Sequence, residues 1–164
     1  MNIRTVTLRS GLIGAAIIVT VIFAFTGCGQ APTKEYYKNG KVKSEQFYKG
    51  GKKHGLSKEY YENGQVKEEI VYKNGKAEGT VKAYYEDKRL RFVGAYKDGG
   101  YEGLFKGYYP SGKLKGEGVY KSGEPDGSFK EYYENGKVKL EAVFKDGKLE
   151  GAVKGYDENG NLKH

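Results

Sequence analysis

Few residues of this sequence are of a type, and in a place, that would support acid–base or metal chemistry. There are two histidines, His54 beside a turn motif and His164 at the C-terminus. The aspartates lie in or next to turn motifs, where Asp is favoured because it bonds to the nearby backbone; they are Asp87, Asp98, Asp126, Asp146 and Asp157. Neither group is clustered with the partners that a nucleophile or a metal site requires. The sequence therefore predicts no catalytic residue, no metal site and no cofactor, and we expect that the protein is not an enzyme.

The single cysteine, Cys28, ends an apolar N-terminal segment. Arg4 and Arg9 are followed by an uncharged stretch, residues 10–27, that is rich in Ile, Val, Ala and Phe. A basic start followed by an apolar run is typical of a secretory signal peptide. We therefore expect residues 1–27 to be a signal peptide that forms a helix.

The residues before Cys28 resemble the bacterial lipobox, in which the cysteine is acylated, palmitate being one such group, and the preceding peptide bond is cut. The motif reads Phe25-Thr26-Gly27-Cys28, with Phe where Leu is usual. The resemblance implies a lipoprotein held by lipid on Cys28, since more than one acyl chain gives stable anchoring. The alternative is an uncleaved anchor, because about 18 apolar residues can be enough to span a bilayer. Both readings place the domain on the extracytoplasmic side of a cell membrane or outer membrane, with residues 28–34 as a flexible tether.

The chain is moderately basic. Its formal net charge is +8, and the predicted signal peptide holds two of the 29 basic residues and none of the 21 acidic ones, so +6 remains on residues 28–164. A surplus of Lys favours contact with anionic surfaces in general. We expect no nucleic-acid partner, because an exported protein would seldom meet one.

The rest of the sequence is an internal repeat of 24 residues. Tyrosines at this interval are Tyr36, Tyr60, Tyr84, Tyr108, Tyr132 and Tyr156, and glycines at the same interval are Gly55, Gly79, Gly103, Gly127 and Gly151. Residues 35–164 hold five full repeats and a partial sixth. Such an array is elongated, because each unit contacts only its neighbours.

Each repeat contains two turn motifs, most of them Asn-Gly, Asp-Gly or Ser-Gly. These dipeptides favour two-residue hairpin turns because both residues accept a positive φ. The turn glycines are Gly40, Gly64, Gly75, Gly99, Gly112, Gly123, Gly136, Gly147 and Gly160. The predicted fold is therefore all-β, an elongated antiparallel meander of about twelve short strands built from double hairpins. Asp87-Lys88 lacks the glycine, so we expect a strained or wider turn there.

Two-residue turns would sort the side chains onto two faces, because alternate strand residues point the same way. One face is then apolar; its residues are Tyr61, Val66, Ile70, Tyr72, Val81, Tyr85, Leu90, Phe92, Tyr96, Phe105, Tyr109, Leu114, Tyr120, Phe129, Tyr133, Val138, Leu140 and Phe144. The other is the candidate ligand face, which we call the Lys/Tyr face; its residues are Tyr60, Tyr84, Tyr108, Tyr132, Lys58, Lys82, Lys106, Lys130, Lys67, Lys115 and Lys139. In this register Lys67 lies opposite Lys82, a like-charge pair that ordinarily destabilises a sheet.

Two interpretations of the Lys/Tyr face stay open. Aromatic rings and ammonium groups in a row can bind sugar rings, anionic lipid head groups or an acidic protein surface. Tyrosine is also a good strand former, and lysine keeps a sheet soluble, so the same composition suits a purely structural face.

The segment from Tyr60 to Lys82, YYENGQVKEEIVYKNGKAEGTVK, resembles the bacterial variant of the MORN repeat. The resemblance implies an elongated antiparallel sheet that serves as a protein-interaction or membrane-associated scaffold, without catalytic residues. Some members are classed as antitoxin or immunity components, which implies a protein partner.

Three functions follow as expectations. The first is a membrane-anchored module for protein–protein interaction, in the manner of an immunity or antitoxin-like partner. The second is binding of an envelope polysaccharide or an anionic lipid through the Lys/Tyr face. The third is a structural spacer in the cell envelope.

Overall fold

The structure is a computed structural model that describes residues 31–163. The predicted signal peptide, residues 1–27, and Cys28 lie outside the described residues. The strands are β1 (Thr33–Tyr36), β2 (Val42–Gln46), β3 (Tyr48–Lys49), β4 (Lys52–Lys53), β5 (Gly55–Tyr60), β6 (Val66–Lys73), β7 (Lys76–Tyr84), β8 (Leu90–Lys97), β9 (Gly100–Tyr101), β10 (Gly103–Tyr108), β11 (Leu114–Lys121), β12 (Glu124–Tyr132), β13 (Val138–Lys145), β14 (Lys148–Leu149) and β15 (Lys154–Gly155).

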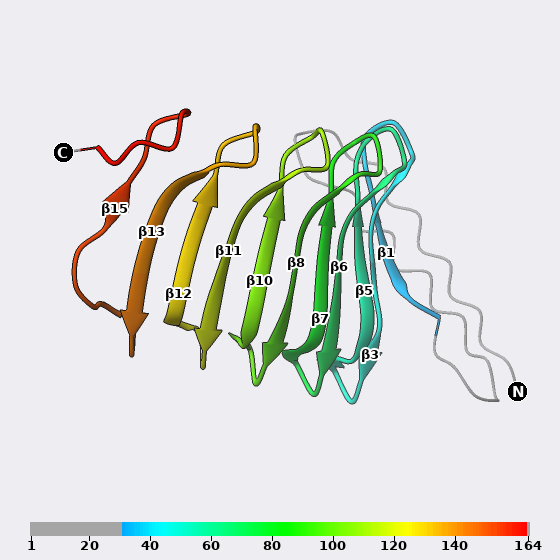
Figure 1. The fold of residues 1–164 in the computed structure, drawn as a ribbon. Coiled ribbons are helices and arrows are strands. Elements are labelled where there is room, and N and C mark those ends of the chain that lie inside the picture. Colours follow the sequence, from blue (N-terminus) through cyan, green and yellow to red (C-terminus); the bar gives the residue numbers. More distant parts are fainter. Residues whose placement is uncertain (1–30, 164) are drawn as a thin grey trace, which may run out of the picture.

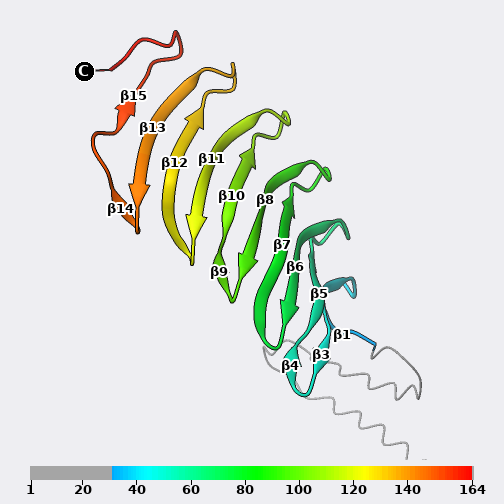
Figure 2. The same ribbon diagram turned by 60° about the horizontal axis from the view of Figure 1, so that its bottom comes forward.

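The strands form one long sheet that follows the order of the chain. The main sheet has 13 strands in the order β1-β2-β5-β6-β7-β8-β10-β11-β12-β13-β14, with β9 paired to β8 and β15 paired to β13. β3 and β4 form a separate two-stranded hairpin. Figure 1 shows the row of strands from β1 at one end to β15 at the other. Successive hairpins are turned relative to one another (Figure 2), as the natural twist of strands requires. The predicted all-β antiparallel meander is confirmed.

The two kinds of turn in each repeat have different geometries, although both contain the Asn-Gly or Asp-Gly signal. At Asn74-Gly75 both central residues have positive φ, 53° and 90°, as in the predicted two-residue turn. The equivalent turns are at Asp98-Gly99, Ser122-Gly123 and Asp146-Gly147, also with positive φ at both residues.

The other kind is a three-residue loop rather than the predicted two-residue turn. Tyr61 N donates to Gln65 O at 2.8 Å, and Gly64 N donates to Tyr61 O at 2.8 Å. Gly64 alone carries a positive φ, 89°, which is the pattern of a hairpin turn closed by a bulge. The register shifts next to this loop, between Glu59 and Tyr60. The bulge changes which side chains face each other further along the strands.

The Asp87-Lys88 turn is not wider than its counterparts. Tyr85 N donates to Arg89 O at 2.8 Å and Lys88 N to Tyr85 O at 3.0 Å, the same bonds that close the Gly64 loop. Lys88 takes the place of glycine at a φ of 72°. The expected strain is therefore present at Lys88, because a side chain in the left-handed region clashes with the following carbonyl.

Strand β1 begins inside the segment that we predicted to be a flexible tether. Lys34 pairs with Glu45 of β2 in the backbone register, so the sheet starts earlier than the first full sequence repeat. No helix within residues 31–163 is long and apolar enough to cross a membrane.

The core of the sheet is thin and lies on the apolar face. The buried apolar residues are Val81, Ala83, Phe105 and Ala142, at 1 to 6% exposure. The Phe105 ring covers Gly94 and the Phe129 ring covers Gly118, where an added Cβ would lie 2.3 and 2.4 Å from ring atoms. Aromatic rings from neighbouring strands therefore pack on these strand glycines. This packing buries apolar area although the sheet has a single layer.

Candidate functional site

One face of the sheet carries an alternating row of lysine and glutamate. In this row each residue is the direct cross-strand partner of the next. It runs through β1, β2, β5, β6, β7, β8, β10, β11, β12, β13 and β15. We call this row the Lys/Glu ladder; its members in spatial order are Lys34, Glu45, Lys58, Glu69, Lys82, Val93, Lys106, Glu117, Lys130, Glu141 and Lys154. The prediction that Lys67 lies opposite Lys82 is wrong, because the register of β6 and β7 shifts between Ile70 and Tyr72 and sets Glu69 opposite Lys82. Lys67 itself lies at the bulge between β5 and β6 and has no cross-strand partner there.

Neighbouring members of the ladder form ion pairs. The Nζ to Oε distances are 2.7 Å for Lys34–Glu45, 2.9 Å for Lys58–Glu69, 3.6 Å for Lys106–Glu117 and 2.9 Å for Lys130–Glu141. The bond from Lys58 holds the pKa of Glu69 below its ordinary value. Three lysines of the predicted Lys/Tyr face, Lys58, Lys106 and Lys130, are thus paired with glutamates of the same face.

Four tyrosines that recur at the 24-residue interval donate to a ladder glutamate. The Oη to Oε distances are 2.8 Å for Tyr60–Glu45, 3.1 Å for Tyr84–Glu69, 2.9 Å for Tyr132–Glu117 and 3.1 Å for Tyr156–Glu141. Burial, followed by the Glu45 bond, raises the pKa of Tyr60 to about 12. These four hydrogen bonds link one repeat to the next. The four phenol O–H groups therefore already have an acceptor within the chain.

Tyr108 differs from these four tyrosines. Its phenol makes no hydrogen bond within the described residues. The ladder member at its glutamate position is Val93.

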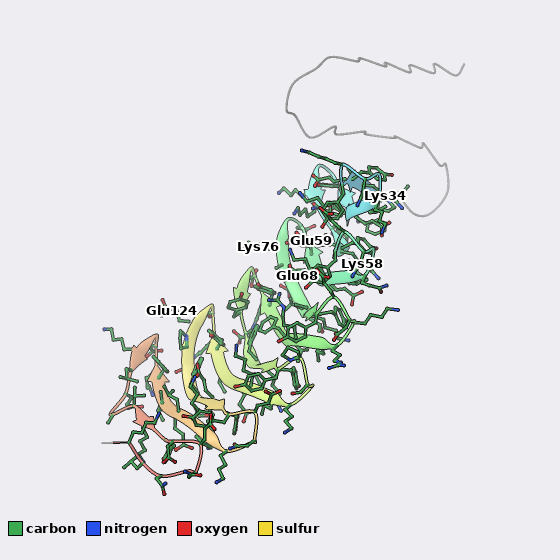
Figure 3. All side chains as sticks on the ribbon, turned by 90° about the horizontal axis from the view of Figure 1, so that it is seen from above. Lys34, Lys58, Glu59, Glu68, Lys76 and Glu124 are labelled. Atoms are coloured by element: carbon green, nitrogen blue, oxygen red, sulfur yellow. The ribbon has the colours of Figure 1, made fainter. Side chains whose placement is uncertain are left out.

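Two lysines that were predicted for the Lys/Tyr face contact glutamates of the opposite face. Lys67 Nζ lies 3.6 Å from Glu59, and Lys139 Nζ lies 3.3 Å from Glu131. Glu59 follows Lys58 on strand β5 and so points to the opposite face. Figure 3 shows Lys34 and Lys58 on one side of the sheet and Glu59 and Glu68 on the other. Lys115, at the equivalent bulge between β10 and β11, lies with its Nζ 5.8 Å from the centroid of the Tyr109 ring.

The second tyrosine of each pair bonds to the backbone of the following repeat. The phenols of Tyr61, Tyr85, Tyr109 and Tyr133 donate to the carbonyl oxygens of Tyr84, Tyr108, Tyr132 and Tyr156 at 2.7 to 2.8 Å. We predicted Tyr61 to be a packing residue of the apolar face. Donor and acceptor are 23 residues apart in the sequence. This spacing indicates the hydrogen bond only when the geometry of the three-residue loop is known.

The opposite face carries a continuous row of aromatic rings over β8 to β13. We call it the aromatic row; its members are Phe92, Tyr96, Tyr101, Phe105, Tyr120, Phe129 and Phe144, with adjacent ring centroids 4.6 to 5.4 Å apart. All but Phe105 are half-buried. No second layer of the described chain covers them. Sequence analysis predicted most of these residues as packing residues of the apolar face and did not predict an open aromatic surface.

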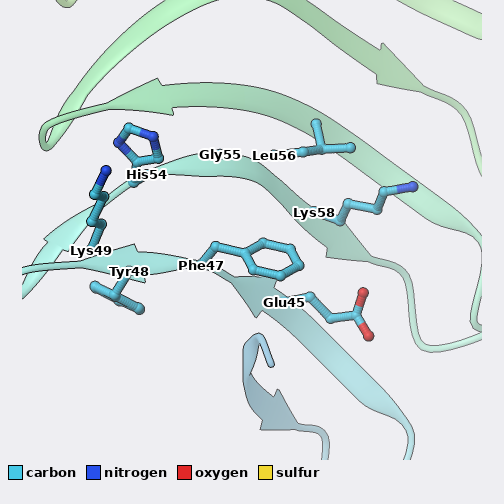
Figure 4. Close-up of a pocket in the computed structure, with 8 residues that line it drawn as sticks. All are labelled: Glu45, Phe47, Tyr48, Lys49, His54, Gly55, Leu56 and Lys58. Atoms are coloured by element: carbon cyan, nitrogen blue, oxygen red, sulfur yellow. The ribbon is translucent and has the colours of Figure 1, made fainter. Parts of the chain in front are cut away.

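An apolar hollow lies near the β3–β4 hairpin. It has a volume of about 800 Å³, and Phe47 and Leu56 line it together with Tyr48 and His54. Figure 4 shows these side chains beside Glu45 and Lys58 of the ladder. His54 Nδ1 is buried without a hydrogen-bond partner. Within residues 31–163, no group of three or more His, Cys, Asp or Glu is placed to hold a metal ion.

Comparison with known families and structures gives one family match. The model of the MORN repeat variant matches residues 30–49, 53–74, 101–122, 125–146 and 149–164. The repeat between residues 75 and 100, which contains Lys88 and Val93, is outside these matches. A comparison with curated proteins found no match.

Solved structures give only weak similarity. One is S. aureus TarM in complex with fondaparinux, alpha-GlcNAc-glycerol and UDP, at 13% identity and a TM-score of 0.39, with 65% of this chain and 21% of that chain covered. A second TarM structure gives 12% identity, a TM-score of 0.39 and coverage of 66% and 21%. A GtfA/B complex bound to UDP and GlcNAc gives 12% identity, a TM-score of 0.29 and coverage of 67% and 22%. The chain spans about a fifth of the length of these proteins, and TM-scores this low do not establish a common fold.

Proposed function

The chain belongs to the MORN repeat variant family, and from that premise we propose that it is a membrane-anchored, non-enzymatic module that binds a partner protein. The observation that carries the proposal is the aromatic row, which the described chain leaves uncovered. We propose the aromatic row, rather than the Lys/Tyr face, as the docking surface. The partner would present an apolar strip to it.

The composition of the aromatic row supports a protein partner. Tyr and Phe bury large areas at low entropic cost and are enriched at the centres of protein interfaces. A contiguous exposed apolar surface on a soluble domain usually marks an interaction site. Tyr101 contacts both Phe105 and Tyr120, at centroid distances of 4.6 and 5.4 Å, so the rings hold one another in place before a partner arrives.

The links between repeats support a rigid binding surface. The Tyr109 phenol bonds to the Tyr132 carbonyl, and the Tyr132 phenol bonds to Glu117. At the other end of the strands, Asp98 N donates to Glu78 and Ser122 N donates to Glu102, both at 2.9 Å. A sheet whose repeats are bonded to one another at both ends of the strands loses little conformational entropy when it binds a partner, and this favours affinity. The same rigidity is what a spacer between envelope surfaces would need, and that role is the second candidate.

The proposed location of the module rests on the sequence around Cys28. We propose that Cys28 is acylated and that the repeat domain lies on the extracytoplasmic side of a cell membrane or outer membrane. An immunity or antitoxin-like role would then concern a toxin that acts in the envelope or arrives from outside.

Site-specific photocrosslinking tests the docking surface. The full chain would carry benzoyl-phenylalanine at Tyr120, in the aromatic row, or at Thr80, an exposed residue of the ladder face. We expect one discrete protein adduct from position 120 and little from position 80 in intact cells. Loss of the adduct on Tyr101→Ala would place the contact on the aromatic row. Absence of any adduct at position 120, or equal adducts from both faces, would contradict the proposal.

A further inference from the structure

Four glutamates of the Lys/Glu ladder share one arrangement of donors. Glu69 accepts a bond from Lys58 on the preceding strand at 2.9 Å and from the Tyr84 phenol at 3.1 Å. Glu117 forms an ion pair with Lys106 at 3.6 Å and accepts a hydrogen bond from the Tyr132 phenol at 2.9 Å. The tyrosine follows the glutamate by 15 residues in each case, and Glu45 and Glu141 repeat the pattern. The ladder face therefore contains four copies of a carboxylate position formed by one lysine and one phenol.

The fifth copy of this position lacks its carboxylate. The ladder residue there is Val93, and Lys82 is its direct cross-strand neighbour on β7. The tyrosine 15 residues later is Tyr108. Within the described residues, Lys82 forms no ion pair and the Tyr108 phenol forms no hydrogen bond, although both are equivalent to residues that do.

The surroundings of Val93 favour an anion. The ladder holds six lysines and four glutamates, and Val93 lies between two of the lysines, Lys82 and Lys106. The Lys106–Glu117 contact, at 3.6 Å, is the longest ion pair of the ladder, so the Lys106 ammonium is the least firmly held. The valine side chain ends at its γ-carbons, so it does not fill the space that the glutamate carboxylates occupy at the other positions.

We propose that Lys82 and Tyr108, with Lys106 beside them, bind one carboxylate group that another molecule supplies above Val93. A carboxylate is the anion that the four complete copies already hold with the same two donors. The site lies on the ladder face, opposite the aromatic row, so it does not depend on the proposed function. It gives the ladder face a single recognition point, in the repeat that lies outside the family matches.

Titration with sodium acetate, followed by NMR, tests the site. Resonances of the Tyr108 ring and the Lys82 side chain are observed against sodium chloride at equal ionic strength. Because exposed ion pairs are weak, we expect half-saturation on the order of 100 mM. The Tyr60 ring, whose glutamate position is filled, should move little and serves as the internal reference.

Two substitutions provide matched controls. Val93→Glu supplies the missing carboxylate within the chain and should abolish the acetate response of Tyr108. Glu69→Val creates the same vacancy beside Lys58 and Tyr84 and should give Tyr84 an acetate response that the wild-type chain lacks. No response at Tyr108, or an equal response in the Val93→Glu variant, would overturn the proposal. The Val93→Glu comparison is sufficient by itself if Glu69→Val does not fold.

Further probes identify the source and the chemistry of the anion. The peptide acetyl-Gly-Glu-Gly-amide, compared with its Gln analogue, distinguishes a protein side chain from a small acid. Binding of the Glu peptide at least as tight as that of acetate assigns the site to an acidic protein segment. A response to acetate without one to the peptide assigns it to a free small carboxylate. A tighter response to inorganic phosphate than to acetate would overturn the assignment to carboxylates.

Discussion

The phenolic oxygen of Tyr109 lies 2.7 Å from the carbonyl oxygen of Tyr132, 23 residues later in the chain, and donates a hydrogen bond to it. The same link recurs from Tyr61 to Tyr84 and from Tyr85 to Tyr108. In three of the Tyr-Tyr pairs, which begin at Tyr60, Tyr84 and Tyr132, the first tyrosine donates back to a glutamate and the second donates forward to a carbonyl. These two bonds connect a repeat to both of its neighbours.

Replacing Tyr109 by Phe should therefore destabilise the array. The change removes one hydrogen bond to a part-buried carbonyl and should lower the free energy of unfolding by about 1 kcal/mol. Urea denaturation followed by circular dichroism measures the effect. Tyr36→Phe is the control, because Tyr36 is exposed and its phenol makes no hydrogen bond within the described residues. Equal effects of the two substitutions would show that the forward link contributes nothing.

Two glycines of the strands should respond differently to the same substitution. A Cβ at Gly118 would lie 2.4 Å from the Phe129 ring, whereas a Cβ at Gly107 has nothing nearer than a backbone oxygen at 3.9 Å. Gly118→Ala should therefore cost about 1 to 3 kcal/mol by displacing the ring. Gly107→Ala should be neutral or mildly stabilising, because it only reduces the freedom of the unfolded chain. Thermal unfolding of both variants separates the cases, and equal losses would contradict the packing of Phe129 over Gly118.

The sequence period was enough to predict the architecture of the sheet. The 24-residue recurrence and the turn dipeptides predict an antiparallel meander, and the structure has it. The turn geometry could not be predicted from the dipeptide, because Asn63-Gly64 and Asn74-Gly75 are identical in sequence and differ in structure. At the first, only Gly64 is left-handed and a bulge follows, and at the second both residues are left-handed. The Asn-Gly dipeptide alone therefore does not decide between the two geometries.

That one-residue bulge also explains which parts of the candidate site were predicted. The phenols of the Tyr60 row lie on the same face as Lys58 and its repeats, as expected. Lys67 and Lys139 reach carboxylates of the opposite face, because they occupy the bulge. The 24-residue period alone shows that Val93 takes the place of a glutamate. That Lys82 and Lys106 flank this position becomes visible only when the strands are aligned in space.

Lys88 is expected to be a site where glycine stabilises the protein. Its φ of 72° lies in the left-handed region, which costs a side-chain-bearing residue about 1 to 2 kcal/mol. Lys88→Gly should raise the free energy of unfolding by about 1 kcal/mol, since the flexibility of glycine in the unfolded chain offsets part of the relief. The reciprocal change, Gly112→Lys, should lower it by a similar amount, because no atom within 4 Å obstructs a side chain there and only the backbone conformation opposes it. Urea titration of both variants checks the prediction, and a loss of stability in Lys88→Gly would refute it.

Cys28→Ser should release the protein from the membrane if Cys28 carries the lipid. Acyl chains on the cysteine would supply the attachment, since each buried methylene contributes about 0.8 kcal/mol. The wild-type chain should incorporate an alkyne-tagged fatty acid and enter the detergent phase of a phase separation, and the variant should do neither. A wild-type chain that stays in the membrane without incorporating the label would instead favour the uncleaved anchor.

The adjacent carboxylates Glu68 and Glu69 should respond to acid in opposite directions. The bond from Lys58 holds the pKa of Glu69 below its ordinary value of 4.5. Its contribution to stability is therefore complete above 4.5 and is lost as the pH falls through the lowered pKa of the folded state. Burial, with repulsion from Glu59, raises the pKa of Glu68 above 4.5, so ionised Glu68 opposes folding near neutral pH and this cost disappears as the pH falls toward 4.5.

Glutamine at each position tests these signs. At pH 7, Glu69→Gln should lower the free energy of unfolding and Glu68→Gln should raise it, each by about 0.5 kcal/mol because both groups are partly exposed. Both differences should shrink well below pH 4.5, where the carboxyl groups that they replace become neutral in the folded and the unfolded chain. Added salt should reduce them at pH 7, since ionic screening weakens exposed charge pairs. Urea titrations from pH 3 to pH 7 measure both curves. If both variants change the free energy of unfolding in the same direction at pH 7, the two carboxylates do not lie in opposite electrostatic environments, and the prediction is wrong.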